Sequence, residues 1–111
     1  MSTTQRAGTF VNNTKIAEDI TTSASYQYEL LDMAHRAMYC VGIEAGASHS
    51  VYYTLHSGPS SDGPWNEIKA ETSIAAAAEV VEEGLCYGEY LRIGVKQNSG
   101  ADTVTLTAFG K

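Results

Sequence analysis

The sequence is poor in the residues that usually mark chemistry or a special compartment. Its 111 residues include only two prolines, two cysteines and three histidines, and seven lysines and arginines stand against thirteen aspartates and glutamates. The resulting net charge of −6 leaves too few cations to neutralise a phosphate backbone, which argues against direct nucleic-acid binding. A chain of this length is expected to form one domain with a modest core.

Long apolar runs are also lacking. No stretch approaches the eighteen or so apolar residues of a membrane span, and "MSTTQRAGTFVNNTK" at the start has no apolar middle of a signal peptide. We therefore expect synthesis in a cytoplasm. In that compartment Cys40 and Cys86 are expected to be reduced, buried small hydrophobes. Because they are not closely spaced, they do not form a zinc motif.

Motifs for catalysis are missing as well. No serine is framed by glycines as in a nucleophile elbow, and Asp62 alone offers too few hard ligands for calcium. The acidic stretch 79–83 is typical of a solvated face rather than of two carboxylates across a sugar cleft. The histidines lack partners at metal-ligand spacing; they are His35, His49 and His56. We therefore expect no enzyme activity, no metal and no cofactor.

Alternating apolar and polar residues are what the sequence does have. Alternation with β-branched and aromatic residues predicts half-buried strands. The predicted strands are 26–31, 37–44, 50–57, 89–97 and 103–109. In the last two, the residues predicted to face the core are Leu91, Ile93, Val95, Val104, Leu106 and Ala108. Short strands separated by turns predict an all-β fold, an antiparallel β-sandwich of jelly-roll type.

One segment is ambiguous. "ETSIAAAAEVVEEGL", residues 71–85, contains a helical stripe of apolar residues, and Gly84 stands where a helix C-cap would. Alanine-rich runs favour helix locally, whereas an all-β context favours two short strand pieces around "EVVEE". Both interpretations stay open for residues 72–84, and the architecture favours strands.

Residues 1–22 differ from the rest of the chain. They are rich in Thr, Ser and Asn, with scattered apolar residues and no helical stripe. One interpretation is a frayed tail. The other is an extended arm that lies along a neighbouring protein, with residues 23–111 forming the sandwich domain. The contact residues of such an arm would be Phe10, Val11, Ile16 and Ile20.

The stretch "HSGPSSDGPWNEI", residues 56–68, holds both prolines and the single tryptophan. Its glycines and prolines predict a turn that ends one strand, and Pro64 presets φ just before Trp65. We interpret Asp62, Gly63, Pro64 and Trp65 as a structural corner, after which Trp65 restarts a strand and plugs the end of the sandwich. The rival interpretation makes Trp65 or Tyr52 a stacking platform for a sugar.

The order of three motifs is similar to that of a known class. A strand "YYTLHSG" runs into the loop "PSSDGPWNEI", and "YGEYLRIGVKQNSGADTVTLTAFGK" follows as the last part of the sequence. Over residues 37–111 this resembles the small β-sandwich structural proteins of tailed bacteriophages, in which a strand runs into a "sxDGxxW" loop.

The resemblance implies a non-enzymatic virion component. Within that class, the short length and the N-terminal arm are similar to those of capsid decoration (cement) proteins. These are made in the host bacterial cytoplasm and sit on the outer capsid surface between capsomers, commonly as homotrimers. They stabilise the shell through contacts with the major capsid protein. The alternatives are another virion component, such as a tail, neck or fibre-base protein, or a carbohydrate-binding β-sandwich module.

Overall fold

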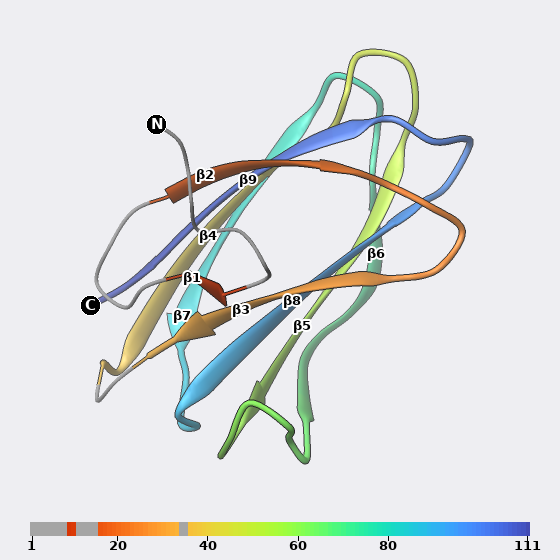
Figure 1. Cartoon of the computed structure of the whole chain (residues 1–111). Helices are drawn as coiled ribbons and strands as arrows, with labels where there is room; N and C mark the ends of the chain where they lie inside the picture. The colour runs from red at the N-terminus through yellow and green to blue at the C-terminus, as the bar shows by residue number, and fades with distance from the viewer. Residues whose placement is uncertain (1–8, 11–15, 34–35) are drawn as a thin grey trace.

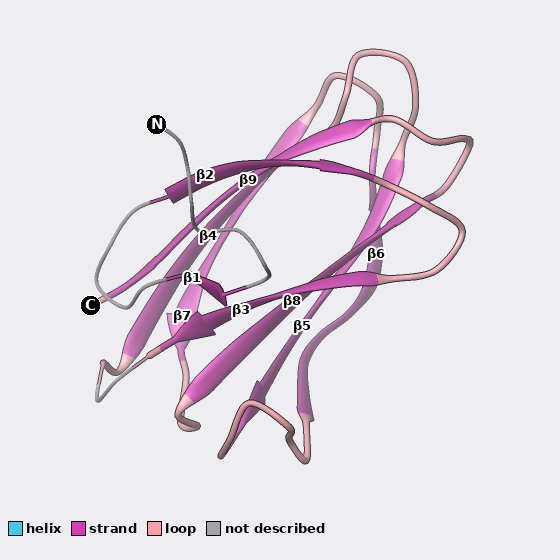
Figure 2. Ribbon diagram, in the orientation of Figure 1, coloured by secondary structure: helices cyan, strands magenta, loops and turns pink. Residues whose placement is uncertain are grey.

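The computed structural model of the chain describes residues 9–10, 16–33 and 36–111, and these ranges contain strands, turns and loops but no helix (Figure 2). The strands are spread along the described chain, from red near the N-terminus to blue near the C-terminus in Figure 1. They are β1 (Thr9–Phe10), β2 (Ile16–Thr21), β3 (Gln27–Asp32), β4 (Met38–Glu44), β5 (Val51–Gly58), β6 (Asn66–Ile74), β7 (Glu79–Leu85), β8 (Tyr90–Gln97) and β9 (Thr103–Gly110).

The strands form two sheets. One has the order β1-β3-β8-β5-β6 and the other β2-β9-β4-β7, and all pairs are antiparallel except the two-residue β1, which runs parallel to β3. From β2 onward each strand lies in the sheet opposite to its predecessor, apart from the β5–β6 hairpin. This is the strand order of a jelly roll. The predicted all-β antiparallel sandwich of jelly-roll type is therefore confirmed.

The core lies between the two sheets, and the alternation in the sequence sets it. Successive side chains of a strand point to opposite faces, so every second residue enters the core. Each fully buried Val, Leu or Ile side chain stabilises the fold by about 1.5–3 kcal/mol. The strands β4, β5, β8 and β9 bury Tyr39, Val41, Ile43, Val51, Tyr53, Leu55, Leu91, Ile93, Val95, Val104, Leu106 and Ala108. All six core residues predicted for 89–97 and 103–109 are among them.

Residues 71–85 are strand rather than helix. Strand β6 continues to Ile74, a turn follows, and β7 pairs with β4 from Met38↔Leu85 to Glu44↔Glu79. In the turn, the Ala78 N–H donates to the Ala75 carbonyl at 3.1 Å, and Ala77 has a φ of 64°. Cross-strand pairing along the whole of β7 outweighs the helical preference of the alanines.

The strands β6 and β7 are edge strands of different sheets, and a polar cluster connects the two sheets on this side, called the open side of the sandwich below. The Tyr53 hydroxyl donates a hydrogen bond to Glu82, and the Lys69 Nζ lies 3.6 Å from the same carboxylate. Glu82 stands opposite Val41 in the register, on the core side of β7. Burial and the hydrogen bond to Glu82 raise the pKa of Tyr53. An inward-pointing charge on an edge strand opposes pairing with a further chain.

The N-terminal segment is partly built into the sandwich. Strand β2 pairs with β9 from Ile16↔Ala108 to Thr21↔Thr103, so residues 16–21 form the edge of a sheet rather than a free arm. Ile20 is 8% exposed and belongs to the core of its own chain. Phe10 lies in β1 beside β3, whereas Val11 falls outside the described residues. The contact of these residues with a neighbouring protein stays a prediction.

Candidate functional site

The β5–β6 turn follows the dense run of Gly and Pro. The Ser60 hydroxyl donates to the Gly63 carbonyl at 2.9 Å, and the Gly63 N–H donates to the Ser60 carbonyl at 3.0 Å. Gly63 has a φ of 86°, a left-handed conformation that favours glycine, and the Gly63–Pro64 peptide bond is cis. Asp62 is exposed, and its backbone N–H donates to the Ser60 hydroxyl. Residues 60–64 thus form a turn that is closed by its own hydrogen bonds.

Trp65 lies on the outer surface of the β3-β8-β5-β6 sheet rather than inside the sandwich. A Cβ at Gly58 would lie 2.7 Å from Trp65 Cε3, so the indole ring covers Gly58. The Arg92 guanidinium carbon lies 4.7 Å from the centroid of the Trp65 ring. Gly58 and Arg92 alternate with the buried residues Ser57 and Leu91, which places them on the outer face. Trp65 is therefore half-buried and does not plug the core; it lies beside a pocket at this end of the molecule.

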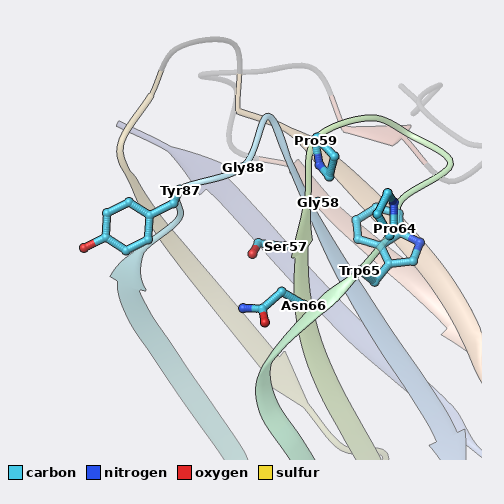
Figure 3. A pocket seen from close by; sticks show the side chains of 8 residues that line it. All are labelled: Ser57, Gly58, Pro59, Pro64, Trp65, Asn66, Tyr87 and Gly88. Carbon is cyan, nitrogen blue, oxygen red and sulfur yellow. The ribbon is translucent and has the colours of Figure 1, made fainter.

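The pocket beside Trp65, called the Trp65 pocket below, has a volume of about 430 Å³. It lies between the β5–β6 turn and the β7–β8 loop. In the view of Figure 3 the Tyr87 ring points away from the other lining residues, and the strand that carries Gly58 lies between Trp65 and Ser57. Tyr87 is 91% exposed. The complete lining consists of Ser57, Gly58, Pro59, Pro64, Trp65, Asn66, Tyr87 and Gly88.

A row of aromatic and cationic side chains continues from Trp65 across the outer face of the same sheet. Arg92 lies 4.1 Å from the centroid of Tyr28, and the Tyr26 and Tyr28 rings are stacked at 5.8 Å. Lys96 lies 4.8 Å from the Tyr26 centroid and 3.2 Å from the Glu71 carboxylate. Lys96 also lies over Tyr52 at 5.3 Å, so Tyr52 is the end of the row opposite to Trp65. The rings are therefore covered by cations rather than open along their length.

Three buried polar atoms belong to this face of the sheet. Thr54 Oγ1, His56 Nδ1 and Arg92 Nε are buried atoms without a hydrogen-bond partner among the described residues. Burial and the positive charge of Arg92 lower the pKa of His56, so its imidazole is neutral at neutral pH. Within the same ranges no group of three or more His, Cys, Asp or Glu side chains is placed to hold a metal ion.

The outer face of the second sheet has a different character. Strands β4 and β7 expose Met38 by 39%, Val81 by 64% and Leu85 by 52%. Gly42 stands opposite Val81 in the register, and a Cβ there would meet nothing within 4 Å. The missing side chain contributes to a hollow of about 240 Å³. This surface, called the Gly42 face below, is lined in the hollow by Cys40, Gly42, Val81, Thr107 and Phe109.

The remaining predicted residues are dispersed. His49 lies 3.6 Å from Asp102, whose carboxylate accepts backbone N–H groups of residues 48, 49 and 103. His35 lies outside the described residues. Cys40 is half-buried and Cys86 is buried, and the two cysteines are not joined by a disulfide. The described part of the chain contains no helix that is long and apolar enough to cross a membrane.

Sequence reasoning did not single out Tyr26, Tyr28 and Arg92 as members of one surface. The available signal was their alternation with Leu31, Leu91 and Ile93, which places them on the face opposite to the core.

Comparisons with known proteins give a fold but no family. No family model matches the chain, and no curated protein matches it. A solved structure of Bacillus endospore appendages, which form disulfide-linked pili, is 11% identical with a TM-score of 0.57, over 87% of this chain and 85% of that chain.

Two further structures are similar to the same extent. The pre-peptidase C-terminal domain of collagenase from Bacillus anthracis is 15% identical with a TM-score of 0.58, over 97% of this chain and 99% of that chain. The Yersinia pseudotuberculosis-derived mitogen is 13% identical with a TM-score of 0.57, over 89% and 87%. At these identities the likeness shows a shared β-sandwich fold alone. None of the three is a phage protein, and the phage resemblance stays a prediction.

Proposed function

We propose that this chain is a non-enzymatic structural protein of a tailed phage, a decoration protein that binds the outer capsid between capsomers. Its partners in this role are the major capsid protein and further copies of itself in a homotrimer. The sequence motifs and the architecture both support the proposal. The motifs over residues 37–111 resemble those of small phage structural proteins, and the jelly roll is an architecture that viral capsid domains use.

The Gly42 face is the observation that carries the proposal. Its exposed apolar residues, Met38, Val81 and Leu85, lie on two neighbouring strands around a hollow that a side chain of a partner can fill. Exposed carboxylates, Glu79 and Glu83, accompany them on β7. An apolar centre with a polar rim is the usual composition of a protein interface. Strand β2 belongs to the same sheet and forms its edge opposite to β7.

Immunolabelling of virions tests the role. Antibodies raised against the purified protein are applied to particles from a phage culture whose DNA carries the gene, and gold labelling is located by electron microscopy. Label on capsids supports a decoration protein, and label on tails or necks supports the alternative virion location. Particles without label contradict the proposal. Light scattering of the purified protein determines the oligomer number.

A matched pair of variants tests the surface. Val81→Glu places a charge on the Gly42 face, whereas Ala70→Glu places the same charge on an exposed position of β6 in the other sheet. We expect the first variant to lose binding to capsids stripped of the protein and the second to keep it. Equal binding of both variants would remove the Gly42 face from the proposal.

A further inference from the structure

The Gly42 face contains a trough that follows β4. This strand lies between β7 and β9, and Val81 and Thr107 stand opposite Gly42 in the two registers. The hollow of about 240 Å³ is continued by a second hollow of about 150 Å³, which shares Gly42, Val81 and Thr107 with it and also includes Glu44 and Glu79 in its lining. The trough therefore has one largely apolar end and one end with two carboxylates.

The charged groups of the Gly42 face are all negative. The outward-facing positions of β4, β7 and β9 alternate with core residues, and none of these positions holds Lys, Arg or His. Glu44 and Glu79 are exposed and stand directly opposite each other in the register. No cation of the described residues forms an ion pair with either carboxylate. Like charges directly opposite on neighbouring strands destabilise a sheet, and a cation from outside would relieve this repulsion.

We propose that the Gly42 face binds an extended segment of a partner protein, in which an apolar side chain and a Lys or Arg stand two residues apart. The apolar side chain fills the hollow over Gly42, and the cation lies between Glu44 and Glu79. Gly42 and Glu44 are two positions apart on one strand, which separates them by about 7 Å. Alternate residues of an extended segment have the same spacing and point to one side. Apolar contact provides binding energy, and complementary charge selects the partner.

The composition of the face disfavours other occupants. A second copy that presents the same face would place its carboxylates against these, so contacts between copies use another surface. Nucleic acid is repelled by the same charge. A bare metal ion is a poor occupant, because the described residues include no group of three or more His, Cys, Asp or Glu that could hold one. The inference rests on the proposed use of the Gly42 face as a docking surface, and it adds the chemistry of the partner segment.

Peptide titration followed by nuclear magnetic resonance tests the inference. The probe is a synthetic peptide with the core Leu-Thr-Lys between flanking threonines, and the matched peptides have the cores Leu-Thr-Glu and Ala-Thr-Lys. Each is added to the isotope-labelled full chain. We expect the Leu-Thr-Lys peptide to shift the amide signals of Gly42, Glu79 and Val81. The two matched peptides should each bind about tenfold more weakly.

Variants of the chain test the two ends of the trough. Gly42→Val should weaken binding of the Leu-Thr-Lys peptide about tenfold by filling the hollow, and it should not lower the thermal unfolding midpoint, because a Cβ there would meet nothing within 4 Å among the described residues. The double variant Glu44→Gln with Glu79→Gln should bind about fivefold more weakly. Its unfolding midpoint should equal or exceed that of the parent, because the like charges are removed. Glu67→Gln, at an exposed position of β6 in the other sheet, is the matched control and should bind like the parent.

The inference is overturned if no peptide binds, if the Leu-Thr-Lys and Leu-Thr-Glu peptides bind equally, or if the shifted amides lie in the other sheet. Unchanged binding by the double glutamine variant also overturns it. The titration requires no phage particle, so its failure is distinct from failure of the virion role. Virions without label together with peptide binding contradict the virion role alone, and labelled virions without peptide binding contradict the inference alone.

Discussion

The hydrogen bond from Tyr53 to Glu82 provides a direct test of how the open side of the sandwich is held. Tyr53 is 2% exposed, so Tyr53→Phe keeps the ring in the core and removes only the hydroxyl. A hydrogen bond to a charged group contributes about 1.5–3 kcal/mol. The Glu82 side chain is 23% exposed and Lys69 remains its partner, which places the expected loss near the lower end. We expect Tyr53→Phe to lower the free energy of unfolding by about 1.5 kcal/mol.

Urea unfolding monitored by circular dichroism measures this loss. Glu82→Gln keeps an acceptor for the hydroxyl and loses the charge that pairs with Lys69, so its cost should be about 0.5 kcal/mol, typical of a partly exposed ion pair. A double-mutant cycle of Tyr53→Phe with Glu82→Ala isolates the coupling between the two side chains. A loss below about 0.5 kcal/mol for Tyr53→Phe, with no coupling in the cycle, would refute the reasoning.

The same hydrogen bond predicts a response to alkali. Burial first and the Glu82 contact second raise the pKa of Tyr53 above its ordinary value near 10. The unfolded chain therefore ionises this tyrosine first as the pH rises. The stability that the group contributes is present below about pH 10 and is lost above it. Unfolding free energies between about pH 8 and 11 should fall less steeply for Tyr53→Phe than for the parent chain.

Three further predictions concern the turns. Ala77→Gly should raise the free energy of unfolding by about 0.5–1 kcal/mol, because Ala77 has a left-handed backbone conformation that glycine adopts without strain. The control Ala76→Gly should lower the free energy of unfolding. Equal losses for the two variants would contradict this. Gly88→Ala should lower the free energy of unfolding by about 2 kcal/mol or more, because the new Cβ would overlap the Gly58 carbonyl. The same substitution should shift the tryptophan emission. A variant with unchanged stability and emission would argue against the contact between the two loops. The three backbone N–H groups that donate to Asp102 lower the pKa of its carboxyl. The contribution of this carboxylate to stability is therefore present above about pH 4 and is lost as the pH falls through the pKa of the folded state. In Asp102→Asn, the free energy of unfolding should depend less on pH in the acidic range; an unchanged pH dependence would contradict this.

The sandwich was predictable where one face of a strand is buried and the other is not. The strands Tyr90–Gln97 and Thr103–Gly110 begin and end within about one residue of the predicted ranges, because alternation directly reports a two-faced strand. For Glu79–Leu85 the local signal was mixed, since Ala-rich sequence favours helix while pairing with β4 favours strand.

Strand Ile16–Thr21 was missed as a strand for a related reason. Its two isoleucines are four positions apart with Glu18 between them, so the sequence has no apolar alternation. Its partner β9 lies near the other end of the chain, and no local pattern reports such a pairing.

The site was predictable as a turn but not as a pocket. The Gly and Pro residues around Asp62 predicted the corner, whereas the position of Trp65 outside the core depends on the missing side chain of Gly58. Tyr87 lies in a different loop, and the contact of Gly88 with Gly58 brings that loop to Trp65. Which residues of different strands and loops become neighbours depends on the topology of the sheets. The periodicity along one strand does not predict it.

The pairing of β2 with β9 sets the order in which the protein can be completed on the ribosome. Strand β2 is synthesised before the other strands of its sheet, yet among the described residues it pairs only with β9, which is synthesised after β4 and β7. The β5–β6 hairpin can form early, because its strands are neighbours in sequence. The sheet β2-β9-β4-β7, and with it the Gly42 face, is completed only when β9 has left the exit tunnel. A nascent chain therefore carries an incomplete sheet, with Met38, Val81 and Leu85 on its outer face, until β9 has been synthesised.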